Sequence, residues 1–144
     1  MLEFVAQNEP ACVPKLRGLV REFLTNLRVD PSTTYDILLA TDEAAANAVA
    51  HGQSAGGNGL VRLRCSTEGS WVVVAIADEG TGFDPSQVSM DELPSWSSPG
   101  GRGLFLVQEL MDRVEIEPSS KGTVIEMRRR VELPPTSAVP IPDE

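Results

Sequence analysis

A carboxylate followed by two glycines lies directly after an apolar run, in residues 78–82, which read DEGTG. The preceding residues 71–77 are apolar and rich in β-branched side chains, which predicts a buried strand. Gly80 and Gly82 have no side chain, so the backbone there can pass close to a ligand. A fixed Asp78 beside open backbone suits a flat base or a phosphate. Because a Gly-x-Gly pair alone is a weak signal, a plain strand-to-loop turn is an equal alternative for this segment.

A second polar group lies on the helix that the apolar pattern predicts over residues 33–50. Glu43, Asn47 and His51 are spaced by four, so they lie on one stripe, about 6 Å apart along the axis. The Asn47 side-chain oxygen is a hard neutral ligand that suits Mg²⁺. Glu43 could orient or deprotonate a hydroxyl or a water near that metal. Taken alone, Glu43 and Asn47 fit a solvated helix face better, and His51 is predicted to be a helix-end residue rather than a ligand.

A third candidate is the glycine-rich segment 100–103, which reads GGRG and precedes a helix predicted over residues 104–111. Backbone N–H groups at a helix N-terminus form a natural phosphate site, although a flexible hinge is an equal alternative. The segment lacks the Lys-Ser/Thr of a P-loop, and residues 80–82 lack the third glycine and following helix of a dinucleotide site. The chain has one histidine and no His/Cys cluster, which argues against a Ser/His/Asp triad and a zinc site.

The size and composition favour one cytoplasmic domain with a real core. The chain has 144 residues, of which 41% are hydrophobic, and it contains neither a membrane span nor a signal peptide pattern. Cys12 and Cys65 show no metal spacing and are interpreted as reduced thiols. The net charge of −9 argues against nonspecific nucleic-acid binding and permits a basic protein partner.

The hydrophobic periodicity predicts a β-α-α-β-β-α-β-β order. We therefore expect an α+β fold, a two-layer sandwich whose mixed, mostly antiparallel sheet is covered on one face by about three helices. The long segment 83–101 between the central strand and the last helix has little periodicity, and loops of this length are often lids. Residues 1–130 are expected to form the domain and residues 131–144 a proline-rich tail. The predicted strands are residues 2–6, 60–65, 71–77, 112–117 and 122–130, and the predicted helices are residues 10–27, 33–50 and 104–111.

Taken together and in this order, the motifs resemble those of the Bergerat-fold ATPases, which include gyrase, the heat-shock chaperone, MutL and histidine kinases. Residues 42–52 (DEAAANAVAHG) resemble the N-box, 78–84 the first glycine box and 100–104 the second, and Gly122-Thr123 resembles the last short motif. The complete set within one short domain is most similar to the anti-sigma factor serine kinases of the RsbW and sporulation type. This resemblance spans residues 2–130 and implies a Bergerat ATP-binding fold.

The resemblance also implies a role for each residue. Asn47 would hold Mg²⁺, Glu43 would be the catalytic base, and Asp78 would bind the adenine of ATP or ADP, supported by Thr123 through a hydroxyl or a water. Arg102 is the only basic residue between Arg64 and Arg113, so the phosphate charge would fall on Mg²⁺, backbone N–H groups and Arg102. The residues that would line the nucleotide are Gly80, Gly82, Gly101, Arg102, Gly103 and Leu104.

By the same resemblance, the chain would be an ATP- and Mg²⁺-dependent serine kinase that binds a sigma factor and phosphorylates a STAS-domain antagonist. Family members are typically homodimers, and no direct contact with nucleic acid or membrane is expected. One alternative is an ATP-gated switch that holds a sigma factor or a phosphatase without phosphorylating it. Glu43 favours the kinase, because a pure binder needs no base. A sensor histidine kinase fragment is disfavoured, because His51 lies in the N-box and no long phosphoacceptor helix precedes the domain.

Overall fold

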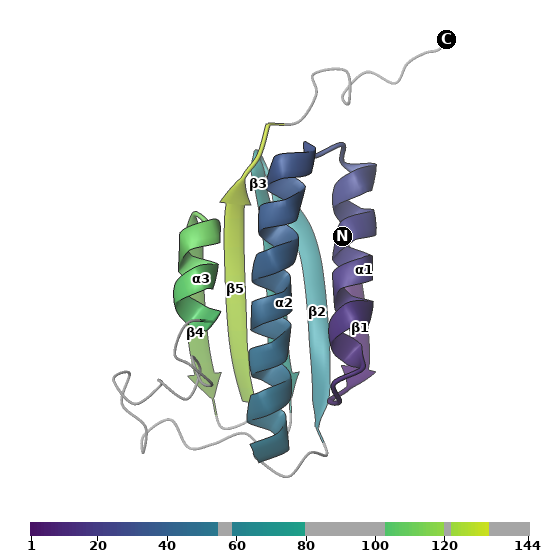
Figure 1. The fold of residues 1–144 in the computed structure, drawn as a ribbon, viewed down its shortest axis with the longest axis vertical. Helices are drawn as coiled ribbons and strands as arrows, with labels where there is room; N and C mark the ends of the chain where they lie inside the picture. The colour runs from purple at the N-terminus through teal and green to yellow at the C-terminus, as the bar shows by residue number, and fades with distance from the viewer. Residues whose placement is uncertain (55–58, 80–102, 120–121, 133–144) are drawn as a thin grey trace.

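The computed structural model describes residues 1–54, 59–79, 103–119 and 122–132, and these form two layers (Figure 1). One layer is a five-stranded sheet and the other consists of helices, so the α+β sandwich expected from the sequence is confirmed. The described elements are β1 (Leu2–Gln7), α1 (Cys12–Asn26), α2 (Pro31–Ser54), β2 (Leu60–Glu68), β3 (Trp71–Glu79), α3 (Gly103–Leu110), β4 (Arg113–Ser119) and β5 (Gly122–Arg130).

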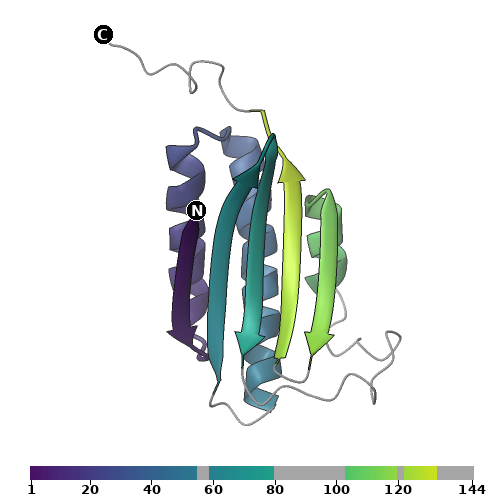
Figure 2. The same cartoon turned by 180° about the vertical axis from the view of Figure 1, so that it is seen from behind.

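The strands lie in the order β1-β2-β3-β5-β4, and each neighbouring pair is antiparallel. The described part of the sheet therefore contains no parallel pair. All three helices lie on one face, with α2 across the middle of the sheet (Figure 1). The opposite face is not covered by a helix (Figure 2). Each residue of a strand thus faces either the helices or the open side.

The junction between α1 and α2 shows why the helices end and begin where they do. Arg28 adopts a left-handed conformation with φ 63, and the Val29 N–H donates to the Leu24 carbonyl at 3.1 Å, which closes the last turn of α1. The Asp30 carboxylate accepts the Thr33 N–H at 3.0 Å and caps α2. The hydrogen bonds that the Asp30 carboxylate accepts from the backbone and side chain of Thr33 lower the pKa of Asp30.

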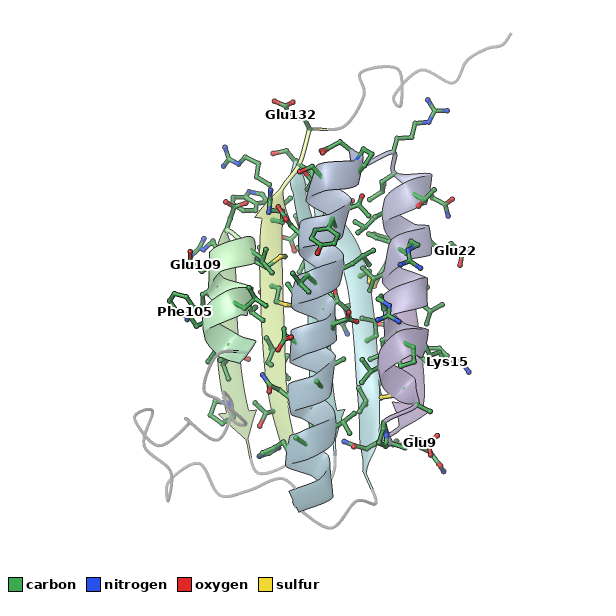
Figure 3. The ribbon with its side chains drawn as sticks, in the orientation of Figure 1. Glu9, Lys15, Glu22, Phe105, Glu109 and Glu132 are labelled. Carbon is green, nitrogen blue, oxygen red and sulfur yellow. The ribbon has the colours of Figure 1, made fainter. Side chains whose placement is uncertain are left out.

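The core lies between the helices and the sheet. Leu16, Leu24 and Ile37 from the helices and Leu63 and Ile76 from the sheet are almost completely buried. Burying each such side chain stabilises the fold by about 1.5–3 kcal/mol relative to exposure. Figure 3 shows the side chains that fill this layer, whereas the labelled Glu22 of α1 and the labelled Phe105 and Glu109 of α3 lie at the outer edges of the helix layer.

Strand β3 carries the helix-facing row into the candidate site. Val72, Val74, Ile76 and Asp78 alternate along the strand and are each at most 3% exposed. The sequence predicted that Asp78 follows the strand. In the structure the strand continues to Glu79, so Asp78 lies inside it. A charged side chain therefore ends a row of apolar core residues.

Several predictions fall on residues outside the described part of the chain. These are the whole lid at 83–101, the tail beyond Glu132, and the site residues Gly80, Gly82, Gly101 and Arg102. The proposed division at residue 130 stays a prediction, although Val131 is buried and its N–H donates to the Ser70 carbonyl at 2.8 Å. Among the described residues, no helix is long and apolar enough to cross a membrane.

Candidate nucleotide site

Asp78 and Thr123 form the floor of the candidate site. They are directly opposite each other on the adjacent strands β3 and β5, and they are 3% and 1% exposed. Side chains at opposite positions of an antiparallel pair lie on the same face, with their Cβ atoms about 4.5–5.5 Å apart. Asp78 and Thr123, which the resemblance assigned to the adenine of the nucleotide, thus lie side by side and face the helix layer.

The C-terminal part of α2 lies over this end of the sheet. Asn47 is 8% exposed, and the His51 Nδ1 lies 2.6 Å from the Asp78 Oδ2. Helix α2 continues to Ser54, four residues beyond the predicted end at Ala50. His51 lies in the last turn of α2, as predicted for a helix-end residue. Its contact with Asp78 was not predicted.

Asn8, directly after β1, is a site residue that sequence reasoning missed. Its side chain is 3% exposed. Its Nδ2 donates to the Ala48 carbonyl at 3.1 Å and to the Asp78 Oδ1 at 3.5 Å, and its backbone N–H donates to the Gly59 carbonyl at 3.0 Å. No local pattern marks it, because its role depends on the pairing of β1 at the edge of the sheet, which brings the residue after the strand to α2.

The Asn47 Nδ2 and the Thr123 Oγ1 are buried at this end and have no hydrogen-bond partner among the described residues. An unsatisfied buried polar group costs about 1–3 kcal/mol, so natural proteins keep few of them. Their position beside the Asp78 carboxylate fits a polar ligand with both donors and acceptors, such as a purine edge. The residues present therefore fit a nucleotide.

The donor set also fits Mg²⁺ held mainly by a nucleotide. Rotation of the Asn47 amide by half a turn brings its oxygen to the place of the unpaired nitrogen, and Mg²⁺ prefers oxygen ligands. Among the described residues, no group of three His, Cys, Asp or Glu side chains could hold a metal ion by itself. A magnesium ion at this place would thus rely on one protein oxygen together with phosphates and water.

Two neighbouring carboxylates on α2 have different surroundings. Asp42 accepts two hydrogen bonds from the Arg17 Nη1, at 3.1 and 3.2 Å, and so ties α2 to α1. Glu43 is half-buried, lies one turn before Asn47, and has no ion pair or hydrogen bond with any described residue. A carboxylate that is positioned by a helix but not engaged by any described side chain is suited to accept a proton from a substrate.

Helix α3 begins at Gly103, close to the predicted start, and Leu104 packs against the core. Figure 1 shows that α3 begins toward the end of the sandwich where α2 ends. The N–H groups of its first turn therefore lie on the side of the molecule that carries Asn47, as a phosphate site requires.

The two cysteines are not candidates for nucleophilic chemistry. Both are buried and free. Burial raises the pKa of Cys65 to about 12, and burial also raises the pKa of Cys12. Both thiols are therefore protonated near neutral pH, and they behave as the reduced core thiols that the sequence predicted.

Comparison with known proteins agrees with this geometry. Residues 6–129 match the family model described as a histidine kinase-like ATPase domain. Serine-protein kinase RsbW of Bacillus subtilis (strain 168) is 33% identical over 133 residues, which cover 85% of this chain and 82% of that protein. An anti-sigma F factor of Clostridium beijerinckii is 30% identical over 125 residues, covering 84% and 85%.

Two solved structures support the fold alone. The RsbU and RsbW domains of a Mycobacterium tuberculosis protein give a TM-score of 0.67 at 21% identity, over 92% of this chain and 32% of that one. The SiaB-SiaC complex of Pseudomonas aeruginosa gives 0.57 at 15% identity, over 92% and 90%. The chain therefore belongs to the histidine kinase-like ATPase domain family and, within it, to the anti-sigma factor serine kinases of the RsbW type.

Proposed function

We propose that this protein is an ATP- and Mg²⁺-dependent serine kinase that binds a sigma factor and phosphorylates a STAS-domain antagonist of that binding. The observation that carries the proposal is the group of buried polar residues, Asn47, Asp78 and Thr123, at one end of an otherwise apolar core. Two of the three keep an atom without a partner among the described residues. Such a group weakens the fold unless a ligand completes it.

Each residue has one task in this proposal. Asp78 accepts a hydrogen bond from the exocyclic amine of adenine, and Thr123 supports the same edge of the base. Asn47 supplies an oxygen to Mg²⁺, which offsets the charge on the phosphates when bound. The first turn of α3 donates N–H groups to the phosphates. Gly80, Gly82, Gly101 and Arg102 would complete the nucleotide site.

The transfer step needs a positioned hydroxyl and a base. The serine oxygen of the antagonist forms a bond to the γ-phosphorus while the bond between that phosphorus and the leaving oxygen of ADP breaks. The serine proton passes to the Glu43 carboxylate. General-base assistance of this kind contributes about 10²–10⁴ in rate. The absence of a competing partner for Glu43 among the described residues supports this role over the ATP-gated switch.

The proposed partners are cytoplasmic proteins, and the chain's net charge of −9 favours a partner with a basic surface. We further propose a homodimer, formed through the open face of the sheet. That face has a shallow hollow of about 360 Å³ over the small residues Ala75 and Ala77. Arg62 and Arg64 line one side of the hollow, and Glu126 lines the other.

The strand register makes this face complementary to itself. One row runs Arg64, Ala75, Glu126, Glu115 across four strands. A two-fold axis parallel to the strands, between β3 and β5, would bring Arg64 over Glu115 of a second copy, and the same contact would occur twice. Arg64→Glu should dissociate the dimer, and adding Glu115→Arg should restore it. Sedimentation equilibrium measures both, and a mass unaffected by Arg64→Glu would exclude this interface.

The kinase assignment is tested with radiolabelled ATP and a STAS-domain protein as the acceptor, with and without Mg²⁺. We expect label on a serine of the partner only when Mg²⁺ is present. A wild-type protein that binds this partner in the presence of ATP but never labels it would overturn the kinase in favour of the switch.

A further inference from the structure

The carboxylate assigned to adenine is held on both of its oxygens by two residues to which the resemblance to ATP-binding motifs assigned no role, one inside the N-box and one outside every motif. His51 Nδ1 lies 2.6 Å from Asp78 Oδ2, and Asn8 Nδ2 lies 3.5 Å from Asp78 Oδ1. Asp78 and Asn8 are each 3% exposed, whereas the His51 side chain is 21% exposed. The two contacts come from different elements, the end of β1 and the last turns of α2.

We propose that His51 and Asn8 are positioning residues that fix the plane of the Asp78 carboxylate and thereby set the selectivity of the site for adenine over hypoxanthine. The proposal rests on the proposed nucleotide function, because it deepens the role of Asp78. It assigns a purpose to the only histidine of the chain and to an asparagine outside the motifs.

Asp78 can still accept a hydrogen bond from a nucleotide base while His51 and Asn8 contact its carboxylate. Each carboxylate oxygen has two lone pairs, so an oxygen that accepts from His51 or Asn8 can still accept a second donor. A hydrogen bond to a charged acceptor is shorter and stronger than a neutral one, as the 2.6 Å separation from His51 indicates. Asn8 is itself fixed, because the same Nδ2 also donates to the Ala48 carbonyl at 3.1 Å.

A rigid carboxylate discriminates between bases better than a mobile one. Adenine presents an amine that donates to Asp78, whereas hypoxanthine presents a carbonyl oxygen at the same place. Two acceptors facing each other in a buried site leave both groups unsatisfied, and this penalty is large only if neither can turn away. With His51 and Asn8 in place, rotation of Asp78 would break one or both of its contacts.

The test measures dissociation constants for Mg²⁺-ATP and Mg²⁺-inosine triphosphate by titration calorimetry. The selectivity is the dissociation constant for Mg²⁺-inosine triphosphate divided by the dissociation constant for Mg²⁺-ATP. We expect His51→Ala to reduce this ratio roughly tenfold, which corresponds to the loss of one hydrogen bond to a charged group. His51→Asn keeps a donor near the place of Nδ1 and should retain the ratio within about threefold of the wild type.

Asn8→Ala should reduce the same ratio, because it frees the other oxygen of Asp78. The matched control is Asn26→Ala at the exposed end of α1, which should leave the ratio unchanged. If His51→Ala does not fold, Asn8→Ala and His51→Asn carry the test, and thermal unfolding identifies which variants are folded.

The outcomes separate the inference from the proposed function. A merely structural role would weaken the binding of both nucleotides equally, so an unchanged ratio in His51→Ala and Asn8→Ala would overturn the inference. If the ratio falls in Asp78→Asn but not in these variants, only the positioning role is lost. If Asp78→Asn also leaves the ratio unchanged, the adenine role of Asp78 is wrong as well.

Discussion

Both ends of the interface between helices and sheet carry polar side chains, and the same two elements, α2 and β5, supply residues to each end. At one end, the Arg129 Nη1 of β5 donates to the Asp36 Oδ2 of α2 at 3.0 Å and to the Leu110 carbonyl at 2.6 Å. At the other end, Thr123 of β5 and Asn47 of α2 each keep a buried atom without a partner among the described residues.

The difference indicates what each end is for. A partly buried polar group that finds its partners within the chain stabilises one arrangement of the elements, as Arg129 does by joining α2, α3 and β5. A buried polar group without a partner costs stability, and such groups persist where a ligand completes them. We therefore expect substitutions at the Arg129 end to change stability and substitutions at the Asn47 end to change nucleotide binding and transfer.

The largest expected effect is on catalysis. Glu43→Gln keeps the size of the side chain but removes the base, so phosphoryl transfer should fall by about 10²–10⁴ while ATP affinity and thermal unfolding stay near wild type. Transfer of radiolabel to the antagonist is the measurement. The matched control is Asp42→Asn, which alters the adjacent carboxylate but only loosens its pair with Arg17. Equal losses in both variants would contradict a specific role for Glu43.

The next largest effect is on stability and is expected at the Arg129 end of the interface between helices and sheet. Arg129→Met leaves Asp36 and the Leu110 carbonyl without their donor, so the free energy of unfolding should fall by about 1–3 kcal/mol. Urea denaturation measures this change, and ATP affinity should stay near wild type. Arg21→Met, at an exposed position of α1, is the control and should change stability by less than about 0.5 kcal/mol. If Arg129→Met lost ATP binding but kept its stability, the assignment of a stabilising role to this end of the interface would be wrong.

A smaller effect of opposite sign is expected for Asn47→Leu. Replacing a buried, unpaired amide by an apolar side chain of similar size should raise the free energy of unfolding by about 1 kcal/mol. The same change removes the proposed Mg²⁺ ligand, so the Mg²⁺-dependent part of ATP affinity should disappear. Denaturation and calorimetry on one preparation measure both. A variant that is less stable and still binds Mg²⁺-ATP would show that Asn47 is structural.

The smallest effect is expected for Thr123→Val, which removes a buried hydroxyl but keeps the shape. ATP affinity should fall by about 0.5–1.5 kcal/mol, the usual contribution of one hydrogen bond, with stability unchanged. Thr41→Val is the matched control, because the Thr41 Oγ1 is also buried but donates to the Ile37 carbonyl at 2.7 Å. Calorimetry should find its ATP affinity unchanged. Equal losses of affinity in the two variants would argue against a direct role for Thr123.

The sequence predicted the parts of the site that local patterns encode. The apolar, β-branched run at residues 71–77 identified the strand that leads to Asp78, the last predicted strand contained Thr123, and the spacing of four along α2 placed Asn47 near His51. These predictions depend only on local composition and on the period of a helix, which the structure keeps.

The contacts of Asn8 and His51 could not be predicted in the same way. Asn8 reaches Ala48, forty residues away in the chain, only because β1 pairs with β2 at the edge of the sheet. For His51, the helical spacing indicates a stripe but not which strand that stripe faces. The length of α2 was also underestimated, because Gly52 ordinarily weakens a helix and yet lies within this one.

The most direct test of the account is titration of Mg²⁺-ATP into the wild type and Asp78→Asn. The account places the base against a buried carboxylate at the polar end of the interface, so loss of one charged hydrogen bond should weaken binding roughly 10- to 150-fold. The variant should remain folded, as thermal unfolding can verify. Unchanged affinity in a folded Asp78→Asn protein would contradict the claim that this end of the sandwich is the nucleotide site.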